Sequence, residues 1–263
     1  MSGAVLQAGA MALFLVLGVV RPRVADQRLM NRDLLLNLAN GALLFVVRVT
    51  LVAWVAAHSG VGLVDLSWLR VPALQLVAAL VVLDFTRYWV HYADHRVPWL
   101  WTFHRVHHSA EVMDATTGLR MHVVDFLQLS AIPVVLFSIV FDTAGFSPWV
   151  EPAALGVGVF FDAIEHGNVR VDPKGTLFRA WNLLFNSPHF HSWHHTRDGA
   201  RCDGNYGNTL VIWDRLFGTE VTGPLPPPLF GLERDQALEN SLVGWHLLRR
   251  RDAPSGGPVA QTN

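Results

Sequence analysis

Long apolar runs separated by short polar stretches dominate the pattern of hydrophobic and polar positions along this chain. A helix needs about 20 consecutive apolar residues to cross the hydrocarbon core of a bilayer, so runs of this length indicate membrane-spanning helices. Five runs reach or approach this length, at residues 4–20, 40–58, 72–90, 123–141 and 148–166. The pattern predicts an all-α fold, a polytopic membrane helical bundle.

The composition agrees with a membrane protein. Of the 263 residues, 51% are hydrophobic and only 16% are charged, whereas about 25% of the residues of a soluble domain are charged. A net charge of −1 argues against a nucleic-acid partner, which would favour a basic face. The single cysteine, Cys202, excludes an intrachain disulfide and a cysteine-ligated metal or iron–sulfur centre.

Arginines between the first two apolar runs set the expected orientation. This loop contains Arg21, Arg23, Arg28 and Arg32. The loop between the second and third runs contains only Arg70, so by the positive-inside rule the first loop is cytoplasmic. Tracing the spans from there places residues 167–263 in the cytoplasm as a helical cap. We expect an integral, multi-pass protein of a bacterial inner membrane.

We expect residues 1–250 to form one membrane-embedded domain, because no internal repeat or second domain is visible in them. Residues 251–263 read "RDAPSGGPVAQTN". A segment with so few large apolar residues cannot bury enough surface to fold, so a disordered tail is predicted.

Histidines recur at helical spacing in three places. His91 and His95 are four residues apart. Two further sets have the spacing i, i+3, i+4: His104, His107 and His108, and His191, His194 and His195. Residues three or four apart share one helix face. A lone histidine is usually a hydrogen-bonded polar residue, but eight in a repeated register on one side of the membrane indicate a metal site. Imidazole suits Zn, Cu, Fe and Ni. Because one metal takes roughly four to six ligands, this number implies two metals, and an all-histidine pair favours redox-active iron.

These motifs carry a family resemblance. HxxxH at 91–95 and HxxHH at 104–108 and 191–195, interleaved with membrane helices, resemble the histidine boxes of the fatty acid hydroxylase/sterol desaturase superfamily. The segments "SPHFHSWHH" and "NYGNTLVIWDRLFGT" resemble its C-terminal signature, and the resemblance covers roughly residues 75–220. It implies a non-haem di-iron membrane oxygenase that uses O2 to hydroxylate or desaturate a fatty acyl, sterol or related lipid.

The resemblance also implies a set of metal ligands for two Fe2+ ions. The family usually supplies one more histidine between the second and third boxes, and His166 matches it. The expected ligands are His91, His95, His104, His107, His108, His166, His191, His194 and His195. We expect Asp162, one helical turn before His166, to contact a ligand histidine or a metal-bound water instead of the metal. No catalytic residue beyond the ligands is predicted.

Several other histidines fall outside this set. His122, in "RMHVVD", resembles the family segment RxHPxE, and we expect it to contact a ligand without binding metal. His189 precedes the third box, and its role is left open. His58 and His246 are expected to be ordinary polar residues.

Acidic residues are expected to support the site and the membrane spans. Metal-bound histidines usually donate their second ring N–H to a nearby acceptor, and the candidate acceptors are Asp198, Asp203 and Asp214. Deep in the second and third spans, Arg48 and Asp84 are expected to form a buried structural pair, because a charge near the bilayer centre costs at least about 2.5–3.5 kcal/mol. Arg87, three residues after Asp84, is a further partner.

Each turnover of an oxygenase needs two external electrons, and the chain has no haem, flavin, nicotinamide or iron–sulfur motif. We therefore expect a separate electron-donor protein, of the ferredoxin or cytochrome type, and a lipid substrate that enters laterally between the helices. Two other classes stay open. A b-type cytochrome would place paired histidines at bilayer depth, and a metal transporter would need ionisable ligands along a path through the membrane. The HExxH motif of a zinc hydrolase is absent.

Overall fold

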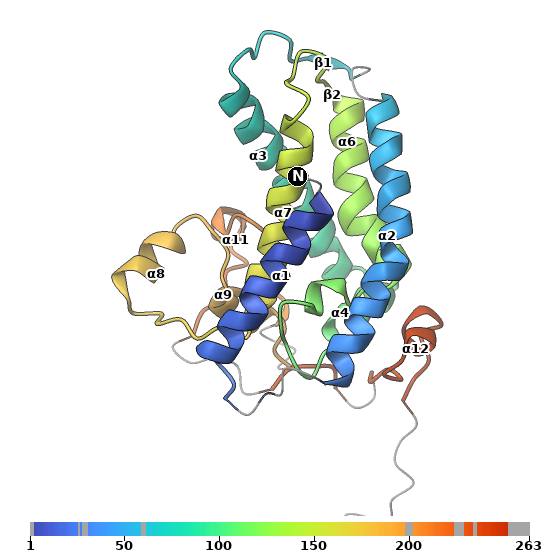
Figure 1. The fold of residues 1–263 in the computed structure, drawn as a ribbon, viewed down its shortest axis with the longest axis vertical. Coiled ribbons are helices and arrows are strands. Elements are labelled where there is room, and N and C mark those ends of the chain that lie inside the picture. Colours follow the sequence, from blue (N-terminus) through green and yellow to red (C-terminus); the bar gives the residue numbers. More distant parts are fainter. Residues whose placement is uncertain are drawn as a thin grey trace, which may run out of the picture.

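The computed structural model describes residues 3–25, 27, 31–58, 62–197, 202–223, 229–233 and 236–251. Its long helical elements are α1 (Gly3–Val20), α2 (Arg32–His58), α3 (Pro72–Arg96), a continuous stretch made of α5 (Val123–Phe126), the π-helix η2 (Leu127–Ala131) and α6 (Ile132–Val140), and α7 (Val150–His166). Helix α7 packs against α1 and α3, and α6 packs against α2 and α3 (Figure 1). The prediction of a helical bundle is confirmed.

Short elements occupy the two ends of this bundle (Figure 1). At one end lie α4 (Pro98–His108), η1 (Thr117–Leu119), α8 (Thr176–Trp181), α9 (Pro188–His194), α11 (Ile212–Phe217) and α12 (Leu242–His246). At the other end β1 (Val64–Asp65) pairs in parallel with β2 (Phe141–Asp142), with Val64 opposite Phe141. Among the residues that the structure describes, these two short strands are the exception to the all-α prediction.

Three described helical stretches are long and apolar enough to cross a bilayer: Arg32–Leu51, Pro72–Arg96 and Val123–Val140. The second predicted run therefore begins earlier than residue 40. The other two predicted spans are shorter, because the apolar part of α1 covers Val5–Val20 and α7 has 17 residues. Large side chains face outward on α2, where Leu35 and Val46 are 58% and 67% exposed. An apolar surface of this kind indicates a lipid environment.

Prolines decide where the histidine-bearing helices begin. Helix α3 ends at Arg96 because Val97 precedes Pro98 and adopts an extended conformation, which the proline ring favours. Pro98 then occupies the first turn of α4, where its missing N–H has no cost. In α9, Pro188 has the same position, and the Ser187 side chain accepts a hydrogen bond from the Phe190 N–H. The reversal at Val97 folds the first histidine box back onto the second.

The expected pair between Arg48 and Asp84 is wrong. The Asp84 carboxylate instead accepts hydrogen bonds from the Thr209 and Leu210 N–H groups, at 2.9 and 3.0 Å. It also accepts one from Trp213 Nε1 at 2.9 Å. These three donors satisfy the carboxylate and tie the loop before α11 to the middle of α3. Arg87 pairs with another acid, Asp162, with 2.7 Å between Nη2 and Oδ1.

The Asp84 anchor leads to the first prediction. In Asp84→Ala, two buried backbone N–H groups lose their acceptor, and each costs about 1–3 kcal/mol when left unsatisfied. We expect the midpoint of thermal unfolding in detergent to fall by several degrees. Asp65→Ala serves as the control, because Asp65 is exposed and accepts only from its own turn at the Ser67 N–H. Equal midpoints for the two variants would contradict the anchoring role.

Candidate metal centre

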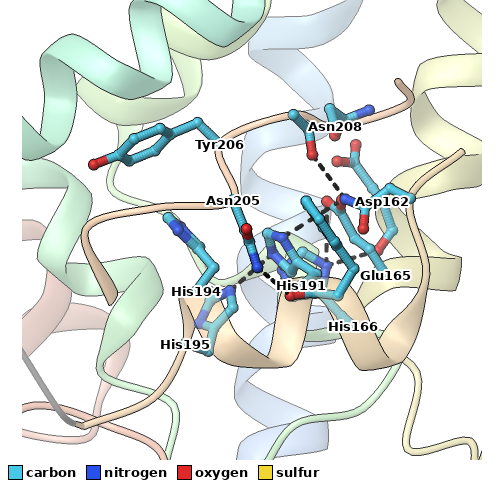
Figure 2. Close-up of polar contacts among 12 residues, drawn as sticks. Asp162, Glu165, His166, His191, His194, His195, Asn205, Tyr206 and Asn208 are labelled. Atoms are coloured by element: carbon cyan, nitrogen blue, oxygen red, sulfur yellow. Dashed lines mark hydrogen bonds and ion pairs between the residues drawn. The ribbon is translucent and has the colours of Figure 1, made fainter. Parts of the chain in front are cut away.

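Four helices bring histidine side chains into two adjacent groups. The five-histidine group consists of His91, His95, His104, His108 and His194. The four-histidine group consists of His107, His166, His191 and His195. Within each group, every residue offers a ring nitrogen within 4.8 Å of the others. The side chains come from α3, α4, α7 and α9 or its C-terminal cap, and Figure 2 shows His166 of α7 beside the histidines of α9.

The two groups contain all nine histidines that the sequence analysis proposed as ligands. The other histidines lie elsewhere. His189, whose role the sequence left open, hydrogen-bonds through Nε2 to the Gly223 carbonyl. His246 hydrogen-bonds through Nε2 to Asn40 Oδ1, as expected for an ordinary polar residue. The side chain of His58 lies outside the described part of the chain.

The expected contact between His122 and a ligand is wrong. The His122 ring caps α5, because Nδ1 accepts from the Val124 N–H at 3.0 Å, and Nε2 donates to the His246 carbonyl. Asp125, three residues later, makes the contact instead: its Oδ1 accepts from His104 Nδ1 at 2.9 Å, and both side chains are fully buried. The acidic position of the RxHPxE-like segment was the signal that could have identified Asp125.

Peptide carbonyls orient many of the rings. His91 Nδ1 donates to the Tyr206 carbonyl at 2.8 Å, and His194 Nδ1 donates to the Gly204 carbonyl at 2.8 Å. His166 Nδ1 donates to the backbone carbonyl of Asp162 at 2.7 Å, whereas the Asp162 carboxylate, the group expected to contact a ligand histidine or a metal-bound water, pairs with Arg87. A carbonyl can only accept, so each ring carries its proton on Nδ1 and leaves Nε2 as a free donor of electrons. This tautomer is usual for metal-bound histidine.

The free Nε2 atoms face one another. His104 Nε2 lies 3.1 Å from His91 Nε2 and 3.2 Å from His108 Nε2. In the other group His166 Nε2 lies 3.1 Å from His107 Nε2 and 3.2 Å from His191 Nε2. Unprotonated nitrogens at this distance repel unless a cation lies between them. Two ligands about 2.1 Å from one metal and at right angles are roughly 3.0 Å apart, so the donor set fits a transition metal in each group.

Burial keeps most of these rings neutral. At His104 the effect of burial is outweighed by the charge and the hydrogen bond of Asp125, which raise the pKa of this ring above its usual value. Removal from water lowers the pKa of His194 to about 3, and a charge on His104 lowers it further. Burial likewise holds the pKa values of His107, His108 and His195 well below the usual value. Neutral imidazoles are the form that binds metal, so the site is ready for metal at neutral pH.

Carboxyl groups of acidic residues also lie next to the rings. Glu165 accepts a hydrogen bond from Asn186 and lies 3.7 Å from His191 Nδ1 and 3.8 Å from His166 Nδ1. Glu165 was not predicted from the sequence, although it directly precedes His166. Of the three aspartates proposed as imidazole partners, Asp203 lies 3.5 Å from His95 Nδ1. Asp198 lies outside the described residues.

Asp214, the third of these aspartates, holds a loop and not a histidine. Its carboxylate accepts from the Tyr206 and Gly207 N–H groups at 2.8 and 2.9 Å and from Thr219 Oγ1 at 2.7 Å. These bonds fix the loop whose Tyr206 carbonyl orients His91. The C-terminal signature thus folds over the histidines, and Tyr206 and Asn208 lie beside them in Figure 2.

A small cavity of about 20 Å³ borders both groups, and its size suits one or two atoms of the scale of a water molecule. Its wall contains His91, His107 and Glu165 on the polar side and Met121 and Leu129 on the apolar side. Leu129 belongs to the π-helix, where Pro133 lacks the N–H that a regular helix would direct to the Leu129 carbonyl.

Comparison with known proteins now defines the class. Residues 76–219 match the family model described as fatty acid hydroxylase, a stretch that contains all nine histidines of the two groups. The chain belongs to the fatty acid hydroxylase family. No solved structure matches it.

The relatives act on different lipids by name. Ornithine lipid hydroxylase OlsE of Rhizobium tropici is 34% identical over 160 residues, which are 59% of this chain and 44% of the relative. Human alkylglycerol monooxygenase is 29% identical over 144 residues, 54% of this chain and 29% of the relative. Fatty acid hydroxylase vlmA of Lecanicillium sp. is 28% identical over 165 residues, 60% and 44% of the two chains. The match therefore spans less than half of each relative.

Acid is expected to destabilise the metal-free fold through these histidines. An imidazole in the unfolded chain titrates near 6.5, whereas the pKa of His194 in the fold is about 3. Between these values the unfolded state binds more protons, so the free energy of unfolding decreases as the pH falls from 6.5 towards 3. Chemical unfolding of chelator-treated protein at a series of pH values measures this. A flat profile across that window would refute it.

Asp125 is expected to strengthen metal binding through His104. Asp125→Asn keeps the shape of the side chain but removes the negative charge from the His104 Nδ1–H contact. Partners of this kind typically contribute 10- to 100-fold to metal affinity, so we expect a loss in that range in chelator competition. Asp172→Asn, at an exposed turn that accepts from the Lys174 N–H, is the control. Equal affinities in all three proteins would rule out this role.

Proposed function

We propose that this protein is a membrane non-haem di-iron oxygenase that uses O2 and external electrons to hydroxylate a lipid. The observation that supports it best is the pair of buried histidine groups whose Nε2 atoms converge at 3.0–3.2 Å. Imidazole-only donors suit a redox-active transition metal, and the family match adds the reaction class.

The proposed assignment places one Fe2+ ion in each histidine group, with the nine histidines as ligands. The bound pair of irons would supply the reduction of O2 and the oxidation of an unactivated C–H bond. The net reaction consumes the lipid, O2, two electrons and two protons, and it yields the hydroxylated lipid and water. Desaturation would use the same irons, and the names of the relatives favour hydroxylation.

The residues around the irons have separable tasks. The carbonyls of Tyr206, Gly204 and Asp162 hold three rings in the metal-binding tautomer. Met121 and Leu129 make one wall of the small cavity apolar, which limits access of water to the reacting carbon. The ion pair between Arg87 and Asp162 forms another part of that wall.

Electrons would come from a separate ferredoxin- or cytochrome-type protein. The arginine-rich first loop favours a cytoplasmic location for the histidine end of the bundle, where such a carrier and its reductant are available. The substrate is proposed to be a membrane lipid, fatty acyl, sterol or related, that reaches the irons from between the helices.

The alternative metalloproteins find less support. A b-type cytochrome places two histidines on opposite faces of one haem, whereas here four or five rings converge on one point in each group. A transporter requires ligands along a path through the bilayer, and the described clusters of metal-binding residues lie around the histidine end.

Metal analysis of the purified protein tests the proposal. We expect about two irons per chain in the parent. His107→Ala and His194→Ala remove one ligand from each group and should lower the iron content clearly. His189→Ala is the matched control, because His189 lies in the same helix as His194 but outside both groups. A haem absorption band, or unchanged iron in both ligand variants, would refute the proposal.

Lipid analysis of a host with and without the gene tests the reaction. We expect one lipid class to gain 16 mass units (one oxygen atom) when the parent is expressed, and no gain with His107→Ala. The hydroxylated species would identify the substrate. A gain that persists with His107→Ala would show that the histidines do not carry the reaction.

A further inference from the structure

Arg48 is a charged residue in an apolar setting without an acidic partner. It lies within the bilayer-length stretch Arg32–Leu51 of α2. Its Nη1 donates to Gln7 Oε1, and its Cζ lies 5.5 Å from the centre of the Phe126 ring. Among the described residues no carboxylate comes within ion-pairing distance of 4.0 Å. A neutral amide and a ring lie against the guanidinium, and the Asp162 carboxylate, which is paired with Arg87, acts on it only from beyond that distance. Much of the cost of a charge in a membrane is therefore left uncompensated.

Two large cavities meet at Arg48. The smaller, about 310 Å³, lies between α1 and α2 and reaches Gly118 and Met121. The larger, about 730 Å³, lies among α2, α3, α6 and α7 and has the size of a typical ligand pocket. Arg48, Phe45 and Phe126 line both cavities.

Both cavities reach the candidate metal centre. The larger shares Arg87, Leu129, Asp162 and Asn208 with the small cavity that borders the histidines. The smaller shares Gly118 and Met121 with it. A lipid chain in the larger cavity would therefore extend towards the histidine groups.

The other charged groups on the wall of the larger cavity already have partners. Asp84 binds the loop before α11, and Arg87 pairs with Asp162. Glu151 accepts a hydrogen bond from Thr143 Oγ1 at 2.6 Å. Apolar side chains such as Leu83, Val134 and Leu155 make up most of the remaining wall. Arg48 is thus the cation of this wall, within the described residues, that has no acidic partner.

We propose that Arg48 binds the anionic head group of the substrate lipid, a carboxylate or a phosphate, while the lipid chain occupies the 730 Å³ cavity. This inference rests on the proposed function, since it names the lipid class for the same site. A guanidinium binds either anion through two parallel N–H···O bonds. The anion would compensate the half-buried charge, and their attraction is strengthened because the surroundings are largely apolar.

Equilibrium binding in non-ionic detergent micelles tests this inference without turnover. The fluorescent probe is the methyl ester of cis-parinaric acid, which is neutral. The competitors are oleic acid, 1-oleoyl-lysophosphatidic acid and neutral 1-oleoylglycerol. We expect at least one anionic competitor to displace half of the probe at a concentration roughly ten times lower than the neutral competitor needs. Hydrogen bonds to a charged group can account for a difference of this size. The better anion identifies carboxylate or phosphate as the preferred head group.

Variants locate the effect. Arg48→Gln should abolish the advantage of the anionic competitor and leave displacement by 1-oleoylglycerol unchanged, and Arg48→Lys should retain part of the advantage. Gln7→Leu should retain it, because Gln7 supplies no charge. Arg70→Gln removes an exposed arginine that lines none of the three cavities and is the matched control.

The inference is overturned if neither anion has an advantage over 1-oleoylglycerol in the parent, or if the advantage survives in Arg48→Gln. If Arg48→Gln fails to fold, the parent still shows whether anions have an advantage. Arg48→Lys then shows whether that advantage depends on Arg48, because it should be reduced in this variant. Iron content is measured on the same samples. Absence of iron in a parent that still prefers anions would contradict the proposed function and leave the role of Arg48 standing.

Discussion

The structure depends on keeping unprotonated imidazole nitrogens close together inside the protein. Facing Nε2 atoms at 3.0–3.2 Å are stable only if the rings are neutral, held in one tautomer and compensated by a shared cation. Burial provides the first condition for most of the rings, and acceptors such as the Tyr206 carbonyl and the Asp125 carboxylate provide the second. The third condition concerns the metal, because a transition-metal ion is the cation that a set of imidazole donors favours.

The rest of the fold can be understood as support for this arrangement. Pro98 reverses the chain so that α3 and α4 present their histidines to each other. The loop that follows the third histidine box is fixed twice, by Asp84 from α3 and by Asp214 from its own continuation. Both acids accept from backbone N–H groups, which have no other way to be satisfied in an apolar region. The carboxylates of Asp84 and Asp214 thus stabilise a loop through backbone hydrogen bonds and do not depend on a positively charged side chain.

The need of backbone N–H groups for acceptors also explains why Asp84 does not pair with Arg48, although the positions of the two residues within apolar runs predicted this pair. Arg48 and Asp84 both lie within helical stretches of bilayer-spanning length, yet the carboxylate is satisfied by a loop 125 residues away. The guanidinium is left at the junction of two cavities. A polar group that finds its hydrogen-bond partners within the chain, such as Asp84, stabilises the fold. A charged group without an ion-pair partner beside a cavity, such as Arg48, is available to bind a ligand of opposite charge.

The sequence by itself determined the class of protein. Apolar runs predicted the helices, and spacings of three and four placed the histidines on single helix faces, because periodicity is a local property of a helix. Only the tertiary structure decided how the nine rings divide into groups of five and four. It also decided that Asp125, and not His122, contacts His104, and that Glu165 lies beside the rings. These contacts join segments far apart in the chain, and their geometry follows from helix packing and chain reversals that local spacing does not contain.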